Sequence, residues 1–283
     1  EATIPMRCWR TKFDEAAAKN VPWPTGPWPA EAQSTFTPEL YVEMGLDGSG
    51  SVVPYSNEVV GKALETWYKE EGITDPRKVP PVMIAKLIAG KVWRDVQPSG
   101  DGMTFTRTGQ LSGIALQPPD LTLSSGRGSY HDVTVMMGAL MRRAGLPARA
   151  VIGYDAGSGD AKFLDKRRSA KELRSWVEFC LYDEAKNTVN WVPVDVVKLR
   201  RMSSRPMPFT RDWKYFGNHD ELDRVTPFAF QFHPPTDVVS SGSPGFWGWF
   251  VTPAPPSRAT QALDFAATLT PVRGGDRDRD RGR

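Results

Sequence analysis

Hydrophobic residues recur at helical spacing in three stretches of the chain. Apolar residues three and four positions apart predict a first helix from about residue 58 to Gly72 and a second over Val82–Val96. A third predicted helix, Tyr130–Ala144, is apolar on nearly all sides, which is typical of a buried central helix. Gly145 follows it and is expected to end it.

The segments after this helix are predicted to be β-strands. Strands are expected at Ala148–Tyr154, Ser175–Tyr182 and Thr188–Val194, with a hairpin turn at Asp183–Asn187 between the last two. A further hairpin is expected at Met103–Ile114. A helix followed by consecutive strands predicts an α+β fold, in which the central buried helix packs on an antiparallel sheet.

Composition divides the chain into four parts. Residues 1–57 predict an extended N-terminal arm, because Val21–Pro29 interleaves Pro with Trp and Pro disfavours both helices and central strands. Residues 58–200 hold the periodic segments and predict the core. Residues 201–273 predict an irregular, Pro- and Trp-rich extension packed on the core or on partners, and 274–283 predict a charged tail.

Aromatic residues gather in both extensions and are the candidate partner contacts. The N-terminal pair packs either on the chain's own body or on a partner, since Trp is enriched at interfaces. The C-terminal group either packs on the body or faces a membrane or a protein partner. These candidate contacts are Trp23, Trp28, Phe246, Trp247, Trp249 and Phe250.

Charge and composition exclude several classes of protein. Lys and Arg number 36 against 33 Asp and Glu, a net charge of +3 that argues against a nucleic-acid-binding protein. No apolar run reaches the roughly 18 residues of a transmembrane helix. Two Cys exclude a disulfide framework and a four-Cys zinc site, and with three His we expect no metal and no cofactor.

The start of the sequence bears on the compartment. The chain begins at Glu1 rather than Met, so we expect a processed or truncated chain, and a removed secretory signal is our hypothesis. In an oxidising compartment Cys8 and Cys180 would form one disulfide, whereas two isolated buried thiols are the alternative.

Short motifs in the predicted core carry a family resemblance. They are Gly128-Ser129-Tyr130-His131-Asp132, Ala144-Gly145-Leu146-Pro147-Ala148-Arg149, Ser175-Trp176-Val177-Glu178 and Trp191-Val192-Pro193-Val194-Asp195. In this order and spacing they resemble the transglutaminase-like superfamily, with its papain-like core. The resemblance implies a Cys nucleophile at a helix start, a His base on a strand and an orienting Asp on the next strand. Those three groups perform acyl transfer or amide hydrolysis.

The chain departs from that pattern at two of the three positions. Tyr130 stands at the Cys position and Arg174 at the His position, while Asp195 matches the family Asp. We expect Arg174 to form a bidentate ion pair with Asp195. We expect the Tyr130 hydroxyl to donate to Asp195 or to a backbone carbonyl.

These departures favour a non-catalytic protein. We expect a structural or binding subunit of a larger assembly, located outside the cytoplasm (periplasmic) and docked as an extrinsic subunit, in one version at a membrane surface. Its partners are expected to be proteins and not nucleic acid.

Two alternatives remain open. One is a hydrolase or acyltransferase that uses Ser129 or His131, with His219 or His233 as the base. The other is a module that binds a peptide or glycan in the family's substrate groove, lined by three aromatic residues. Those residues are Tyr154, Trp176 and Trp191.

Overall fold

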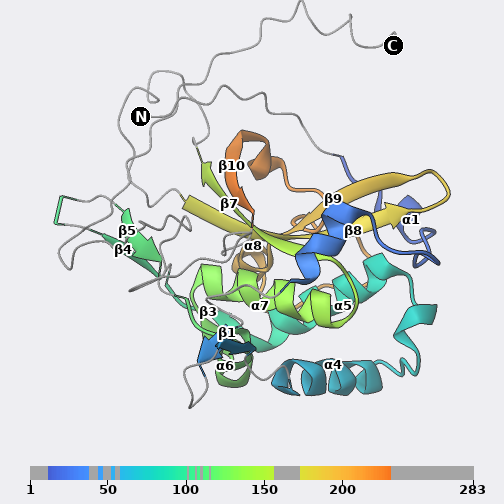
Figure 1. The fold of residues 1–283 in the computed structure, drawn as a ribbon, viewed down its shortest axis with the longest axis horizontal. Coiled ribbons are helices and arrows are strands. Elements are labelled where there is room, and N and C mark those ends of the chain that lie inside the picture. The colour runs from blue at the N-terminus through green and yellow to red at the C-terminus, as the bar shows by residue number, and fades with distance from the viewer. Residues whose placement is uncertain are drawn as a thin grey trace, which may run out of the picture.

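A four-stranded antiparallel sheet forms the centre of the fold (Figure 1). The computed structural model describes residues 12–37, 44–46, 52–54, 58–100, 102–105, 107–108, 111–114, 116–155 and 173–230. The strand order is β10-β7-β8-β9. The bounds are β7 Ala148–Asp155, β8 Leu173–Asp183, β9 Thr188–Val194 and β10 Val225–Phe230. The three predicted strands are confirmed and lie side by side in sequence order.

Helices cover one face of this sheet. The central helix α7, Tyr130–Arg143, packs directly on β7 and β8, and α5, Pro81–Asp95, packs on α7. The helix α4, Glu58–Glu70, lies beyond them and contacts α7, while α8, Val196–Met202, contacts both α5 and α7 (Figure 1). Helices on one face of an antiparallel sheet confirm the predicted α+β fold.

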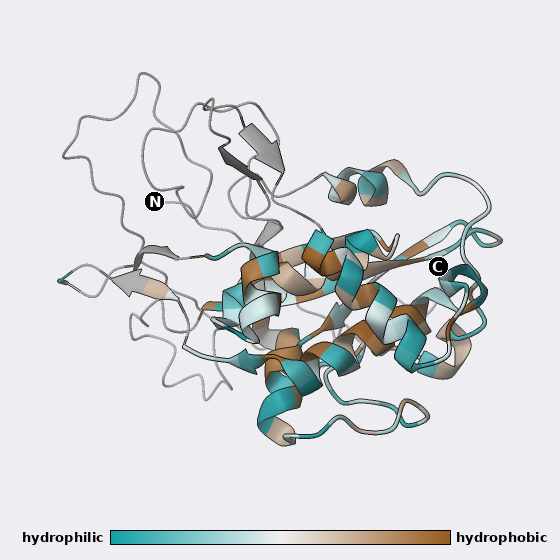
Figure 2. Ribbon diagram, turned by 90° about the horizontal axis from the view of Figure 1, so that it is seen from below, coloured by the Kyte–Doolittle hydropathy of each residue, from teal (hydrophilic) through white to brown (hydrophobic). Residues whose placement is uncertain are grey.

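The central helix is held by its cap and by its apolar sequence. The Ser129 hydroxyl accepts a hydrogen bond from the Asp132 amide at 3.1 Å, and the Asp132 carboxylate accepts from the Ser129 amide at 2.7 Å. This reciprocal capping box satisfies two amides that the helix leaves free. Val133, Met137 and Leu140 are at most 1% exposed. Seen from below, the helical layer mixes hydrophilic and hydrophobic residues along each helix (Figure 2).

Smaller elements surround the sheet and helices. The predicted hairpin is confirmed as β4, Met103–Phe105, paired antiparallel with β5, Leu111–Ile114. The helix α6, Pro119–Ser125, leads into β6, Arg127–Gly128. The remaining short strands are β1 Met44–Leu46, antiparallel to β2 Val52–Pro54, and β3 Gln97–Pro98, parallel to β6.

The described part of the N-terminal arm, residues 12–37, is a strap on the chain's own body. It contains α1 Glu15–Ala18, α2 Ala30–Gln33 and the 3-10 turn η1 Ser34–Phe36, where an extended arm was expected. The expected partner contact Trp23 is instead only 9% exposed, and its indole N–H donates to the Val79 carbonyl at 2.8 Å. Trp28 is half-buried and packs edge-on against the Trp23 ring. The body therefore uses both rings as packing surface.

A buried ion pair joins this strap to the helical layer. Glu15 lies within hydrogen-bonding distance of the Lys86 ammonium, and both side chains are almost fully buried. Lys86 also donates to the Arg211 carbonyl at 2.6 Å. Burial lowers the pKa of Lys86, and the contact with Glu15 opposes that effect. One lysine thus links the strap, α5 and the segment after α8.

The segment that follows α8 contributes to the core where an irregular extension was expected. Trp213 and Phe216 are 1% exposed and belong to the main hydrophobic cluster. After the 3-10 turn η5, Asp220–Arg224, the chain adds β10 to the edge of the sheet. The sequence pattern concealed this strand because Pro227 interrupts it, and Pro is tolerated only at an edge or a bulge. The register shifts beside Pro227.

Candidate functional site

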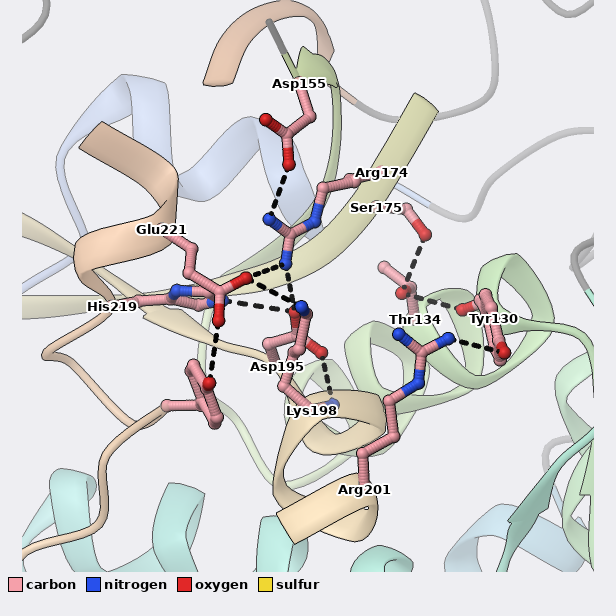
Figure 3. A network of polar contacts seen from close by, with 11 residues as sticks. Tyr130, Thr134, Asp155, Arg174, Ser175, Asp195, Lys198, Arg201, His219 and Glu221 are labelled. Atoms are coloured by element: carbon pink, nitrogen blue, oxygen red, sulfur yellow. Dashed lines mark hydrogen bonds and ion pairs between the residues drawn. The ribbon is translucent and has the colours of Figure 1, made fainter. Parts of the chain in front are cut away.

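Asp195 lies at the junction of β9 and α8, where three elements meet (Figure 3). As the N-cap of α8, its Oδ1 accepts from the Lys198 amide at 2.9 Å. Its Oδ2 lies 3.2 Å from His219 Nε2 and 3.8 Å from Arg174 Nη2. The carboxylate is 7% exposed, so these partners replace water around its charge.

Arg174 reaches Asp195, but the expected bidentate geometry is wrong. Arg174 Nη1 donates to Asp155 at 3.0 Å, and Nη2 donates to Glu221 at 3.2 Å. A single Nη2 approaches Asp195, at an ion-pair distance of 3.8 Å. The guanidinium is divided among three carboxylates because β7 and η5 bring Asp155 and Glu221 to the same side of β8. Sequence reasoning missed these two acids.

Glu221 ties η5 to the strands and to α8. Its carboxylate accepts from the Lys198 ammonium at 2.6 Å and from the Tyr215 hydroxyl at 2.7 Å, besides Arg174. Partial burial opposes its ionisation, but the hydrogen bonds from Lys198 and Tyr215 outweigh that effect and lower the pKa from 4.5 to about 2. Glu221 therefore stays ionised over the whole physiological range.

The low pKa of Glu221 predicts a pH-dependent contribution to stability. A carboxylate whose pKa is depressed by folding stabilises the fold above its ordinary pKa, and this contribution disappears as the pH falls from about 4.5 to 2. We expect Glu221→Gln to lower the free energy of unfolding by about 1 kcal/mol at pH 7, since the site is partly solvated. Urea titrations from pH 7 to pH 2 should show the variant and the parent converging in acid. A difference that persists at pH 2 contradicts this assignment.

His219 is the residue whose place only the structure reveals. Its side chain is fully buried beside Asp195, and Nδ1 is buried without a hydrogen-bond partner. The Tyr215 ring packs against the imidazole with centroids 4.7 Å apart. The sequence offered His219 only as one of two candidate bases for a hydrolase or acyltransferase. No motif in the sequence indicated that it would pair with Asp195.

The Tyr130 hydroxyl has a different partner from the two that we expected. Arg201 donates to it at 2.6 Å, and the guanidinium carbon lies 4.8 Å from the centre of the Tyr130 ring. One turn further along α7, the Thr134 hydroxyl donates to the Tyr130 carbonyl and lies 3.1 Å from the Ser175 hydroxyl. In Figure 3 this group stands apart from the Arg174 network.

The candidate nucleophiles take structural positions. The Ser129 hydroxyl serves as the helix cap described above, and the residue is 6% exposed, while His131 is 1% exposed within α7. Cys180 is a buried free thiol whose pKa burial raises to about 12, which disfavours the reactive thiolate. Cys8, His233 and the aromatic group at 246–250 lie outside the described residues.

The aromatic residues proposed for a binding groove pack inward. Tyr154 and Trp176 are each 4% exposed, and Trp176 donates its indole N–H to Glu178 at 3.0 Å. Trp191 is half-buried beneath Arg149, whose guanidinium carbon lies 3.9 Å from the centre of the Trp191 ring. Arg149 also binds Glu178 at 2.8 Å across the sheet. Tyr154 and Trp176 therefore pack in the interior, while Trp191 is half-buried under Arg149, and the groove alternative stays a prediction.

In the described part of the chain, no helix is long and apolar enough to cross a bilayer. Across the same residues, no group of three or more His, Cys, Asp or Glu side chains is arranged to hold a metal ion.

Two solved structures are similar to the chain at low sequence identity. The "Putative Cysteine Protease" from Cytophaga hutchinsonii is 13% identical, with a TM-score of 0.40 over 86% of this chain and 66% of that one. The transglutaminase of red sea bream is 14% identical, with a TM-score of 0.37 over 62% of this chain and 33% of that one. The chain thus spans about two thirds of the length of the Cytophaga protein and about one third of the length of the red sea bream protein.

One family model matches part of the sequence. No curated protein matches the chain. Residues 103–196 match the family model of the transglutaminase-like superfamily, a range that contains α7, β7, β8, β9 and Asp195. Over these residues, the chain therefore carries a transglutaminase-like core.

Proposed function

We propose that the chain is a non-catalytic transglutaminase-like protein that serves as a structural or binding subunit of a larger assembly. One observation carries the proposal. The residues at the expected nucleophile and base positions are Tyr130 and Arg174, and other side chains already engage both. A phenol with an ordinary pKa near 10 is a poor acyl-transfer nucleophile at pH 7, and a guanidinium does not act as a general base.

The remaining groups around Asp195 support a structural role. Arg174 lies within ion-pair distance of Asp155, Asp195 and Glu221, and Lys198 pairs with Glu221. Such a network fixes β7, β8, α8 and η5 relative to one another. We infer that this part of the fold now holds the segment after α8 against the sheet, where the family places catalysis.

The assembly is proposed to lie outside the cytoplasm, with the chain as an extrinsic subunit beside a membrane-bound complex. The protein purified under native conditions from its own cells is expected to co-migrate with partner proteins. A 31.4 kDa monomer free of partners and membranes contradicts the subunit role. Fractionation of spheroplasts tests the compartment: release with the periplasmic fraction supports it, and retention with the cytosol contradicts it.

Reactive probes distinguish this proposal from the enzyme alternatives. A fluorophosphonate probe is expected to leave Ser129 unmodified, because the Ser129 hydroxyl accepts a hydrogen bond from the Asp132 amide and the residue is buried. A vinyl sulfone probe is expected to leave Cys180 unmodified in the folded chain and to label it after denaturation. An adduct on Ser129 or on native Cys180 favours a hydrolase or acyltransferase and overturns the non-catalytic proposal.

A further inference from the structure

Arginine residues gather where α8 ends beside the C-terminal end of α5. Arg200 donates to the Trp93 carbonyl, to the Arg94 carbonyl at 3.0 Å and to the Gln97 side-chain oxygen at 2.9 Å. Gln97 in β3 is the register partner of Arg127 in β6. Arg200 and Arg127 are therefore brought to the same edge of the molecule by the β3–β6 pair.

Two more arginines extend this cluster. Arg201 donates to the Tyr130 hydroxyl, at the start of α7. Arg205 is exposed after a turn in which the Ser203 hydroxyl donates to the Arg205 carbonyl at 2.7 Å. The Ser203 carbonyl in turn accepts from the Trp93 indole, so this turn is fixed to α5. We call Arg127, Arg200, Arg201 and Arg205 the arginine patch.

Within the described residues, the contacts of Arg200 and Arg201 do not neutralise their positive charge. Arg200 and Arg201 donate to carbonyl, amide and hydroxyl oxygens, which carry no formal charge. Of the acids that border the patch, Asp95 pairs with Arg94 at 2.5 Å, and Asp120 accepts from the backbone amide of Leu121. Four guanidinium groups in this position create a local positive potential although the whole chain is only +3.

Exposed apolar side chains border the same patch. The two large hydrophobic residues most exposed in the described structure are Met202, at 52%, and Leu121, at 50%. Met202 ends α8 between Arg201 and the Arg205 turn, and Leu121 lies on α6, which leads into Arg127. Guanidinium groups around an apolar side chain fit the interface of a bilayer, where the charges meet headgroups and the apolar chain enters the acyl boundary.

We propose that the arginine patch binds anionic phospholipid headgroups at a bilayer surface, with Met202 entering the interface. This inference rests on the proposed function, which puts the chain beside a membrane. Each basic side chain near an anionic bilayer strengthens binding about fivefold, and salt screens the attraction. An acidic protein surface is the competing partner for the same charges.

The test is sedimentation of the full chain with vesicles of phosphatidylcholine containing phosphatidylglycerol. We expect the chain to bind these vesicles at about 0.1 M salt. Binding should be weaker at about 0.5 M salt, and weaker to vesicles of phosphatidylcholine alone. The triple variant Arg127→Gln, Arg201→Gln, Arg205→Gln should bind on the order of a hundredfold more weakly. Arg200 is left in place because it caps α5. Met202→Ser should weaken binding severalfold and keep its dependence on phosphatidylglycerol.

Matched variants exclude general effects of charge and folding. Arg127→Lys, Arg201→Lys, Arg205→Lys keeps the charge and should keep the binding. Lys62→Gln, Lys69→Gln, Lys186→Gln removes three exposed charges elsewhere and should leave binding within about threefold of the parent. Equal binding by the parent and the Arg→Gln variant overturns the proposal, as does equal binding to vesicles without phosphatidylglycerol.

The outcome separates this inference from the proposed function. A chain that binds no anionic vesicle but co-purifies with its partners overturns the lipid site and leaves the subunit role standing. If the Arg→Gln variant then drops out of the native assembly, the patch contacts an acidic protein and the lipid proposal is wrong.

Discussion

Lys86→Met is expected to lower the free energy of unfolding by about 3–5 kcal/mol, the largest loss that we predict for a single side chain. The substitution keeps most of the side-chain volume but leaves the Glu15 carboxylate buried without its ammonium. One Glu15 oxygen is already buried without a hydrogen-bond partner, and the other cation beside this carboxylate, Lys19, is 33% exposed and replaces a buried ammonium poorly. The Lys86→Met substitution also removes the hydrogen-bond donor to the Arg211 carbonyl. Urea-induced unfolding at pH 7 measures the difference.

A neighbouring lysine supplies the control for this experiment. Lys19 lies 3.2 Å from the same Glu15 oxygen, but its side chain is 33% exposed. Lys19→Met should therefore cost no more than about 1 kcal/mol. The double variant Glu15→Met, Lys86→Met should recover most of the loss, since an apolar pair of similar volume replaces a buried ion pair at little cost. A double variant as unstable as Lys86→Met contradicts the ion-pair explanation.

Asp195→Ala is expected to destabilise the fold by about 2–4 kcal/mol, which combines two losses. The first is the N-cap of α8, whose removal costs about 1 kcal/mol. The second is the charged acceptor of His219 beside Arg174, where losing a hydrogen bond to a charged group costs about 1.5–3 kcal/mol. Thermal unfolding followed by circular dichroism measures the total.

Asp195→Ser separates these two contributions. Serine keeps an oxygen that can cap α8 but has no carboxylate for His219 and Arg174. We expect it to be about 1 kcal/mol more stable than Asp195→Ala and still well below the parent. If Asp195→Ser equals the parent, the carboxylate contributes little, and the structural interpretation of the cluster around Asp195 is wrong.

Periodic segments explain why much of the fold was predictable. Helix α7 is apolar along its length and bounded by Ser129 and by Gly145, whose φ of +85° suits a helix end. The hairpin of β8 and β9 consists of two strands rich in apolar residues on either side of a short polar turn. Such local patterns depend on neighbours in sequence, so each element is readable without knowledge of the rest.

The residues of the site could be predicted only where they stand within a recognised sequence motif. Asp195 and Arg174 were expected to meet because a family pattern aligns them, and they lie within ion-pair distance. The partners that set their geometry come from elsewhere: Glu221 and His219 follow a stretch without periodicity. Pairings between side chains far apart in sequence leave no local pattern.

Spacing and composition were enough to predict the helices α4, α5 and α7, the strands β7, β8 and β9, and the kind of side chain at each motif position, but not the strand β10. The tertiary structure decided what those side chains do. In the folded chain, Trp23 is buried on the chain's own body, Arg174 contacts three carboxylates, and His219 lies against Asp195. The tertiary structure also gathered arginines from β6 and α8 around the end of α5. The role of a charged side chain depends on the partners and solvent around it, which only the folded chain fixes.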